Sequence, residues 1–308
     1  MNTTVANPGS IPAASDLAGL EPIEKIMRRW PALLGAALSL LMIAGLANEL
    51  FDRGLTGLSQ TAPSSWIFYL FFALFYLGPP TFDYVIFRRL WKIPASGMVA
   101  LHRKRIANEV VLGYSGEAYF YAWARQRTQM VAAPFGAVKD VSILSAIAGN
   151  AITLAMLALA LPLATELLTP AQFNTALVSI AIMVAMSLPF LIFSKRVFSL
   201  PRGTLWWVFG IHSLRLVLGS ILIACAWHFA MPDVSLGMWL ILAAARMLVS
   251  RLPFVPNKDL LFANFAIILI GQGQALSELL AFTAALTLLV HVVLFAGFGL
   301  MGLIRKDI

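Results

Sequence analysis

Residues Ser65 to Lys92 read SWIFYLFFALFYLGPPTFDYVIFRRLWK, and this stretch decides the fold class of the chain. A helix needs about 20 apolar residues to cross the hydrocarbon core of a bilayer. The stretch holds one charged side chain, Asp83, before it ends in Arg88, Arg89 and Lys92. Cytoplasmic loops collect Lys and Arg, so we expect a transmembrane helix that ends on the cytoplasmic side.

Comparable apolar segments recur along the rest of the chain and predict an all-α polytopic membrane protein with about eight transmembrane helices. Their spans alternate across the bilayer without a misfit. The predicted segments are Pro31 to Leu50, Ser65 to Phe87, Phe135 to Ala164, Ala171 to Phe193, Thr204 to Phe229, Val234 to Leu252, Leu260 to Ile270 and Leu279 to Leu303.

The basic residues orient these segments. Of the 22 Lys and Arg, only Arg53 falls on the side opposite the others, and Arg215 and Arg246 fall inside predicted spans. Because the rich side is the cytoplasm, both termini are expected to be cytoplasmic. This distribution is typical of a protein of the bacterial inner membrane.

The composition excludes an ordinary soluble domain. Hydrophobic residues make up 60% of the chain and charged residues 12%, and the mean hydropathy is +0.85. An ordinary soluble domain has about twice that fraction of charge. The net charge of +8 resides in loops, where it contacts anionic headgroups rather than nucleic acid. The single Cys225 and four scattered His give no metal-ligand spacing, so neither a metal nor a cofactor is expected.

Two parts of the chain do not read as simple spans. Residues 1–24 are expected to form a flexible cytoplasmic tail, and residues 25–308 a single integral membrane domain. Within that domain, residues 93–130 are helix-like but rich in charge. They either lie in the interface as amphipathic helices or dip into the membrane and return, with the Gly113-Tyr-Ser-Gly116 sequence as the turn.

The second half of the chain contains a stretch with a partly similar pattern of charged, apolar and glycine residues. Residues 251–259, RLPFVPNKD, lead into a short apolar run that ends in Gly271-Gln-Gly-Gln274. Paired interrupted segments in two halves of a membrane protein point to a transporter-type site at an internal two-fold repeat.

The same two stretches resemble the flippase-like family that includes the transmembrane domain of lysylphosphatidylglycerol synthases. One carries ANE at residues 107–109 and GEAYFYAWAR at residues 116–125. The other carries LPFVP at residues 252–256, although NKDL stands at 257–260 in place of the family's glycines, and Gly113-Tyr-Ser replaces a proline. The resemblance covers roughly the whole chain and implies movement of a lipid or lipid-linked molecule between leaflets.

Charged side chains inside the predicted spans are the first candidates for a binding site. Arg215 lies in the middle of the fifth segment, with His212 one turn before it. A charge at this depth is costly and therefore needs a partner. Arg215 either binds an anionic headgroup or forms a buried ion pair, with Asp83 or Asp140 as candidate partners.

The remaining ionisable residues have weaker assignments. For Arg246 we favour a side chain that reaches the cytoplasmic interface. Lys139 and Asp140 are adjacent and should not face each other on a helix, so Lys139 is expected to meet Glu117, and Asp140 to meet Arg125 or Arg127. Glu117 either receives an ammonium group or a proton, or is an ordinary residue near a helix N-terminus.

Taken together, the expected substrate-binding residues lie in the interrupted segments and in the spans. They are Glu117, Arg125, Lys139, Asp140, His212, Arg215, Arg246, Arg251, Lys258 and Asp259. Basic residues from Arg103 to Arg127 are expected to gather the headgroup at the cytoplasmic face. His291 is expected to form a hydrogen bond with a neighbouring helix.

The leading function is transport of a membrane lipid with an anionic headgroup. No catalytic constellation is evident. Two alternatives remain open: a lipid-modifying transferase that uses Glu117, His102 or His212 as a base, and a non-transporting subunit of an envelope-assembly complex. The sequence also leaves a homo-oligomer open.

Overall fold

The computed structural model describes residues 62–111, 114–127, 135–167, 197–251 and 273–304, with isolated positions at 33–44, 174–188 and 262–267. Every regular element in this part of the chain is a helix. The predicted all-α class is therefore confirmed.

Four helices of the described part are long and apolar enough to cross a bilayer. They are α2 (Trp66–Trp91), α5 (Phe135–Leu167), α8 (Arg202–Ala230) and α11 (Gly273–Ile304). They correspond to the second, third, fifth and eighth predicted segments. The chain is therefore a multi-pass membrane protein.

The other predicted segments have different outcomes. The sixth appears as α9 (Leu236–Arg251), an apolar helix of 16 residues. The predicted interruption at Gly271-Gln-Gly-Gln274 overlaps the start of α11, which begins at Gly273. The segments predicted at 31–50, 171–193 and 260–270 lie outside the described residues except for isolated helical positions.

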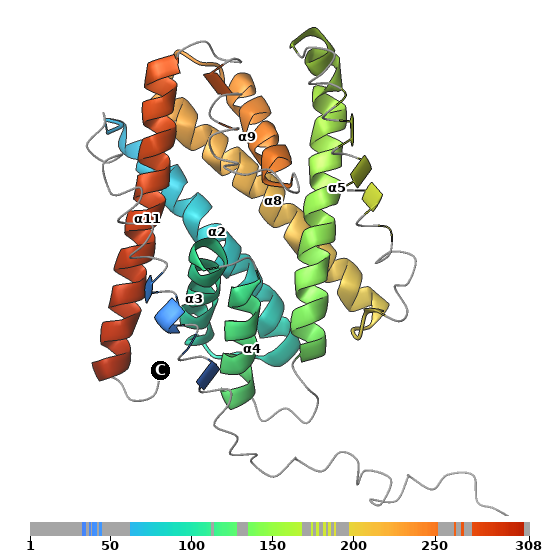
Figure 1. Cartoon of the computed structure of the whole chain (residues 1–308), viewed down its shortest axis with the longest axis vertical. Coiled ribbons are helices and arrows are strands. Elements are labelled where there is room, and N and C mark those ends of the chain that lie inside the picture. Colours follow the sequence, from blue (N-terminus) through green and yellow to red (C-terminus); the bar gives the residue numbers. More distant parts are fainter. Residues whose placement is uncertain are drawn as a thin grey trace, which may run out of the picture.

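The helices form a tilted bundle, as Figure 1 shows. Helices α2 and α8 lie side by side and run diagonally between α11 on one side and α5 on the other. Helix α9 packs against α8 and α5. Two shorter helices, α3 (Gly97–Val110) and α4 (Ser115–Arg127), pack against each other between α11 and α5.

An aromatic core joins α2, α8, α9 and α11 at the end of the bundle where α2 begins. The ring of Phe68 in α2 lies 5.9 Å from that of Phe282 in α11, and Trp227 in α8 lies 5.7 Å from Trp239 in α9. Aromatic pairs at these separations stabilise a core beyond their buried area. Phe68, Trp227 and Trp239 are fully buried, so this end of the bundle is closely packed.

The α3–α4 hairpin runs back along α2 toward the middle of the bundle. Phe120 in α4 packs against Phe87 near the end of α2, with ring centroids 4.5 Å apart. Two turns along α3 from its start, Arg105 donates a hydrogen bond to the backbone carbonyl of Tyr76, near the middle of α2. The hairpin therefore packs into the bundle beside α2, and the choice between an interfacial and a re-entrant position in the membrane stays a prediction.

The hairpin turns where the sequence predicts, near the Gly113-Tyr-Ser-Gly116 stretch. Tyr114 has a positive φ of 70°. The backbone N–H of Gly116 donates to Asn108 Oδ1 over 2.7 Å, and Ser115 Oγ donates to the carbonyl of Ala107 over 2.8 Å. These side chains satisfy polar backbone groups that no water would reach inside a membrane.

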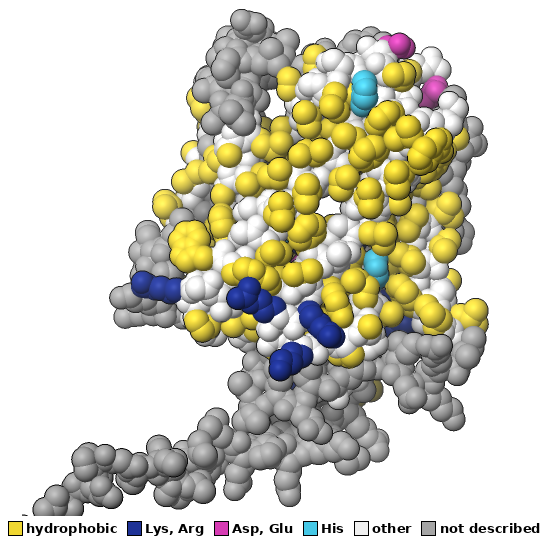
Figure 2. Space-filling model, turned by 180° about the vertical axis from the view of Figure 1, so that it is seen from behind, with side chains coloured by type: hydrophobic (Ala, Val, Ile, Leu, Met, Phe, Trp, Pro, Cys, Tyr) yellow, Lys and Arg dark blue, Asp and Glu magenta, His cyan; other side chains and the backbone are white. Residues whose placement is uncertain are grey.

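The surface has the charge distribution expected of a membrane protein. On the face shown in Figure 2, described Lys and Arg gather at one end and Asp and Glu at the other, with a broad hydrophobic band between. Exposed apolar side chains of α8, such as Leu214 and Ile221, contribute to the apolar surface. Arg88 and Arg89, at the end of α2, lie at the basic end, in agreement with the predicted orientation.

Candidate functional site

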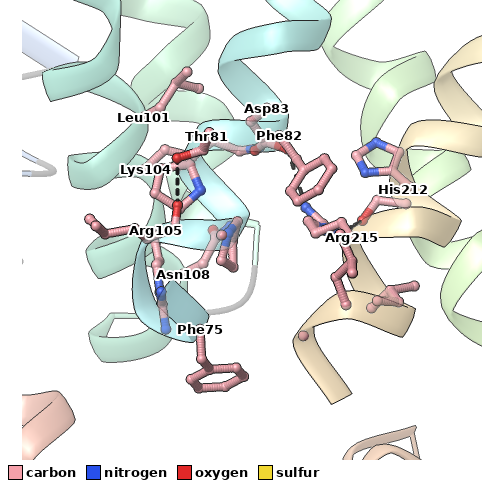
Figure 3. A pocket seen from close by; sticks show the side chains of 18 of the residues that line it. Phe75, Thr81, Phe82, Asp83, Leu101, Lys104, Arg105, Asn108, His212 and Arg215 are labelled. Atoms are coloured by element: carbon pink, nitrogen blue, oxygen red, sulfur yellow. Dashed lines mark hydrogen bonds and ion pairs between the residues drawn. The ribbon is translucent and has the colours of Figure 1, made fainter. Parts of the chain in front are cut away.

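A cavity of about 830 Å³ lies within the helix bundle, walled by residues of α2, α3, α4, α5, α8 and α9. Most of its lining is apolar, but eight ionisable side chains face it. They are Asp83, Lys104, Arg105, Glu109, Glu117, His212, Arg215 and Arg246. Figure 3 shows most of these residues converging from α2, α3 and α8.

Asp83 is the centre of the charged lining. Its carboxylate accepts a hydrogen bond from Lys104 Nζ at 2.6 Å and one from an Arg215 guanidinium nitrogen at 3.2 Å. Asp83 and Lys104 are both buried. Because a buried ion is costly without a partner, this carboxylate holds α3 and α8 against α2.

Two further contacts complete the cluster. Lys104 also lies 3.4 Å from a carboxylate oxygen of Glu117 in α4, and Arg215 donates to Ser145 Oγ in α5 at 2.8 Å. The two carboxylates and two cations therefore balance. The second carboxylate oxygen of Glu117 is buried and has no hydrogen-bond partner among the described residues.

His212 and Arg246 complete the polar wall on the α8–α9 side. His212 is 1% exposed, so its ring is buried in the cavity wall. The Arg246 guanidinium carbon lies 5.8 Å from the centroid of the Phe75 ring in α2. The guanidinium group of Arg246 therefore lies beside the middle of α2, and the expectation that it reaches the cytoplasmic interface stays a prediction.

A second polar network joins the hairpin to α11. Tyr76 Oη lies 2.7 Å from His291 Nδ1, and His291 Nε2 lies 2.8 Å from Glu109 Oε2. Arg105 Nε donates to the other Glu109 oxygen at 2.7 Å. The expected hydrogen bond between His291 and a neighbouring helix is confirmed, and α2 and α3 both supply a partner.

Proline creates part of this network. Pro80 lies inside α2 and has no N–H, so the carbonyl of Tyr76 four residues earlier lacks its usual helical donor. Arg105 donates to that carbonyl and also stacks over the Tyr76 ring, with its guanidinium carbon 4.2 Å from the ring centroid. The Pro79-Pro80 pair thus provides a docking point for α3 on α2.

The sequence-based pairings have mixed outcomes. Asp83 is a partner of Arg215, as one of the two alternatives predicted. The other candidate, Asp140, is fully buried and instead accepts hydrogen bonds from the backbone N–H groups of Ser199 and Leu200 at 2.7 and 2.8 Å. Asp140 therefore holds the segment that precedes α8 against α5, and it does not line the cavity.

Lys139 and Glu117 also differ from expectation. Lys139 Nζ lies 3.4 Å from a carboxylate oxygen of its neighbour Asp140. Adjacent residues of a helix are expected not to meet, but the flexible side chain of lysine lets its ammonium group bend back toward Asp140. It also donates to the Val197 carbonyl. Glu117 pairs with Lys104 rather than with Lys139.

The basic residues of α3 and α4, which are predicted to gather a headgroup, have several kinds of neighbour in the structure. Arg103 donates to the carbonyl of Phe298 at 3.0 Å and to Tyr119 Oη at 3.2 Å. Lys104 and Arg105 point into the cavity. Arg125, in α4, donates to Tyr121 Oη at 2.9 Å.

The cavity thus brings together four of the ten predicted site residues: Glu117, His212, Arg215 and Arg246. The side chain of Arg251, and Lys258 and Asp259 altogether, lie outside the described residues. Glu109 is not among the predicted site residues, and Lys104 and Arg105 are predicted only as part of the basic stretch from Arg103 to Arg127. The sequence signal for these three residues was their spacing. Glu109 follows Lys104 by five residues and Arg105 by four, so Arg105 and Glu109 lie on the same side of one helix, next to Asn108.

No arrangement for a metal is visible in the part of the chain that the structure describes: no three His, Cys, Asp or Glu side chains are grouped to hold an ion. The chain matches no protein-family model, no curated protein and no solved structure. The resemblance to the flippase-like family therefore stays a prediction. Of the residues that carry it, Asn108 and Gly116 form the tip of the hairpin.

Proposed function

We propose that this protein moves a lipid or lipid-linked molecule with an anionic headgroup between the leaflets of the bacterial inner membrane. The observation that carries the proposal is the cavity of about 830 Å³, lined by ionised side chains inside a bundle of membrane-spanning helices. Ionisable residues at membrane depth are costly and commonly mark substrate pathways. The volume lies within the usual range of about 300–1,000 Å³ for small-molecule sites.

The charge of the described lining supports a headgroup with one net negative charge. Three carboxylates and four Lys or Arg side chains face the cavity. A guanidinium group has five N–H donors, so Arg215 retains donors beyond those that Asp83 and Ser145 use. Arg recognises phosphate with two parallel hydrogen bonds, which favours a phosphate-containing headgroup.

The proposal includes the full topology predicted from the sequence: eight spans, an internal two-fold repeat and cytoplasmic termini. Supporting it, the described basic and acidic surfaces lie at opposite ends of the bundle. The α3–α4 hairpin forms one wall of the cavity, so its movement would open the cavity toward the cytoplasmic end. We propose that protons or the membrane potential supply the energy, because the sequence has no phosphate-cradling glycine loop.

The test is movement of a fluorescent phosphatidylglycerol across the bilayer of proteoliposomes made of phosphatidylethanolamine and phosphatidylglycerol. Three proteins are compared with the wild type: Arg246→Gln, the double variant Asp83→Asn with Arg215→Gln, and Arg202→Gln. The double variant removes one charge of each sign, so it avoids leaving an uncompensated buried ion. Arg202 is exposed at the start of α8 and serves as the control.

We expect the wild type and Arg202→Gln to move the lipid at the same rate. The two cavity variants should slow it by about tenfold or more, the usual effect of losing a hydrogen bond to a charged group. A wild type that moves neither this lipid nor a panel of other anionic lipids would overturn the proposal. So would cavity variants that match the wild type.

One observation favours the transferase as a second candidate. The ring of His212 is buried at the cavity wall, which places the side chain of a general base beside the proposed lipid site. Mass spectrometry of lipids incubated with the purified protein decides between the two. A product of altered mass that His212→Gln abolishes would favour the transferase, whereas a stoichiometric partner protein without any lipid movement would favour an assembly subunit.

A further inference from the structure

A second cavity, of about 600 Å³, lies between α4 and α5. Its walls are chiefly apolar side chains, among them Ala118, Val138, Ile143 and Ile147. The nitrogen-bearing polar side chains in its lining are Lys139 and Asn150, both on α5. Only two charged side chains, Glu117 and Lys139, are among its lining residues, fewer than in the charged cavity that it adjoins.

The two cavities share part of their lining. Tyr114, Glu117, Ser142 and Ala146 line both of them. The two cavities are therefore separated by a single layer of side chains, and two of these side chains, Ser142 and Ala146, are small. The buried Glu117 oxygen that has no described hydrogen-bond partner lies at this junction.

We infer that the second cavity holds an acyl chain of the same lipid whose headgroup occupies the charged cavity. The inference rests on the proposed function and narrows its substrate to a glycerolipid bound by both its polar and its apolar parts. A polar site and an apolar site that share a wall match the two ends of one amphiphile. A single cavity of either kind would bind only one end.

The size of the second cavity argues against a partner helix as its occupant. A helix with its side chains is about 10 Å across and rises about 5.4 Å per turn. The volume of about 600 Å³ would therefore take only about one and a half turns. A flexible hydrocarbon chain can fill such a short and irregular space.

Affinity is not what this cavity would provide. Lipid tails are as apolar as the side chains of the cavity, so a chain gains little hydrophobic free energy when it leaves the bilayer for the protein. The cavity instead fixes where the chain lies relative to the headgroup. We therefore expect it to select lipids by chain length and shape, and to keep the headgroup at the level of Arg215 and His212.

The inference is tested by photocrosslinking in native membranes. Bacteria that express the full chain are fed a fatty acid with a photoactivatable diazirine near its end, so that every glycerolipid carries the probe. After irradiation, crosslinked peptides are mapped by mass spectrometry. We expect crosslinks at Ala118, Ile143 and Ile147 at least tenfold above those at the exposed residues Leu214 and Ile221 of α8, which sample annular lipid.

Two variants sharpen the test. Ala146→Trp fills the junction of the cavities and should remove the enriched crosslinks, whereas Leu214→Trp, on the exposed surface of α8, should leave them unchanged. The wild-type map stands without either variant if one fails to insert. Crosslinks spread evenly over α4, α5 and α8 would overturn the inference.

The outcomes separate this inference from the proposed function. Enriched crosslinks in a protein that moves no lipid would overturn transport and retain the chain site. Lipid movement with evenly spread crosslinks would overturn the chain site and retain transport.

Discussion

At the scale of single residues, Asp83 has the greatest influence on the charged cavity. It is the one charged residue in an apolar run, and its carboxylate pairs with Lys104 and with Arg215. The Arg215 contact joins residues 132 positions apart in sequence. One side chain on α2 therefore positions the ionised groups of two other helices around the cavity.

The first prediction concerns the cost of removing this carboxylate. Asp83→Ala leaves Lys104 with Glu117 alone and Arg215 with Ser145 alone, so we expect a loss of about 3–5 kcal/mol, typical of a broken buried ion pair. Thermal unfolding in mild detergent, followed by circular dichroism, measures the effect.

The control for this prediction removes one charge of each sign, so that the remaining Lys104 still pairs with Glu117. The double variant Asp83→Asn with Arg215→Gln should lose clearly less stability than Asp83→Ala, although it removes more charge. Equal melting temperatures for Asp83→Ala and the wild type would show that the cluster does not hold the helices together.

At the scale of elements, the α3–α4 hairpin decides the form of the site. Both helices supply side chains to the cavity, and α3 is bound to α2 through Arg105 and to α11 through Glu109. Gly116 in α4 lies in close contact with the backbone of α3. A Cβ atom there would collide with the backbone carbonyl of Lys104.

The second prediction follows from that close approach. Gly116→Ala should destabilise the protein by about 1–3 kcal/mol, the usual cost of overpacking, because backbone rather than a mobile side chain must move. It should also separate Lys104 from Glu117 and so reduce lipid movement. Thermal unfolding and the proteoliposome assay measure the two effects.

Gly210→Ala in α8 is the matched control, because a Cβ atom there meets nothing within 4 Å. It should be neutral or stabilise the protein by about 0.5–1 kcal/mol, since alanine is the better helix former. A Gly116→Ala variant as stable and as active as Gly210→Ala would contradict the close packing of the hairpin.

At the scale of the whole molecule, opposite ends of the bundle carry opposite charge. The turn between α8 and α9 contains Asp233, whereas α2 ends in Arg88 and Arg89 and α8 begins at Arg202. On the face shown in Figure 2 a broad apolar band separates the two ends, as expected of a surface that lies in the hydrocarbon layer. The positive end should therefore face the cytoplasm.

The third prediction tests this orientation by thiol labelling in intact cells. Cys225 is first replaced by Ala, because it is the only Cys of the chain. A membrane-impermeant maleimide should then label Asp233→Cys from outside, and Ala95→Cys, between α2 and α3, only after the membrane is opened. The reverse pattern would invert the topology and contradict the positive-inside assignment.

Much of the fold could be predicted because it depends on local properties of the sequence. Long apolar runs such as residues 204–229 form helices wherever a bilayer surrounds them, because only helices satisfy their own backbone groups there. The turn of the hairpin was likewise predictable from Gly113 and Gly116. Whether residues 93–130 enter the membrane was not, because their mixed polarity suits both alternatives.

The candidate site was predictable only in part, because only charges that interrupt an apolar run are conspicuous in the sequence. Arg215 and Arg246 stand out because they interrupt apolar runs. Lys104, Arg105 and Glu109 do not, because the helix-like stretch around them is rich in charge. Only their burial against α2 and α11 distinguishes them.

The sequence by itself determined the all-α class, the positions of the long spanning helices and the end of the bundle that is basic. Hydropathy and charge along one segment are sufficient for these, because each helix responds to the bilayer independently. The tertiary structure alone decided that the hairpin enters the bundle, that Asp83 rather than Asp140 partners Arg215, and that Glu117 faces Lys104. Those outcomes depend on which helix faces pack together, and a buried charge takes whichever opposite charge the packing brings within reach.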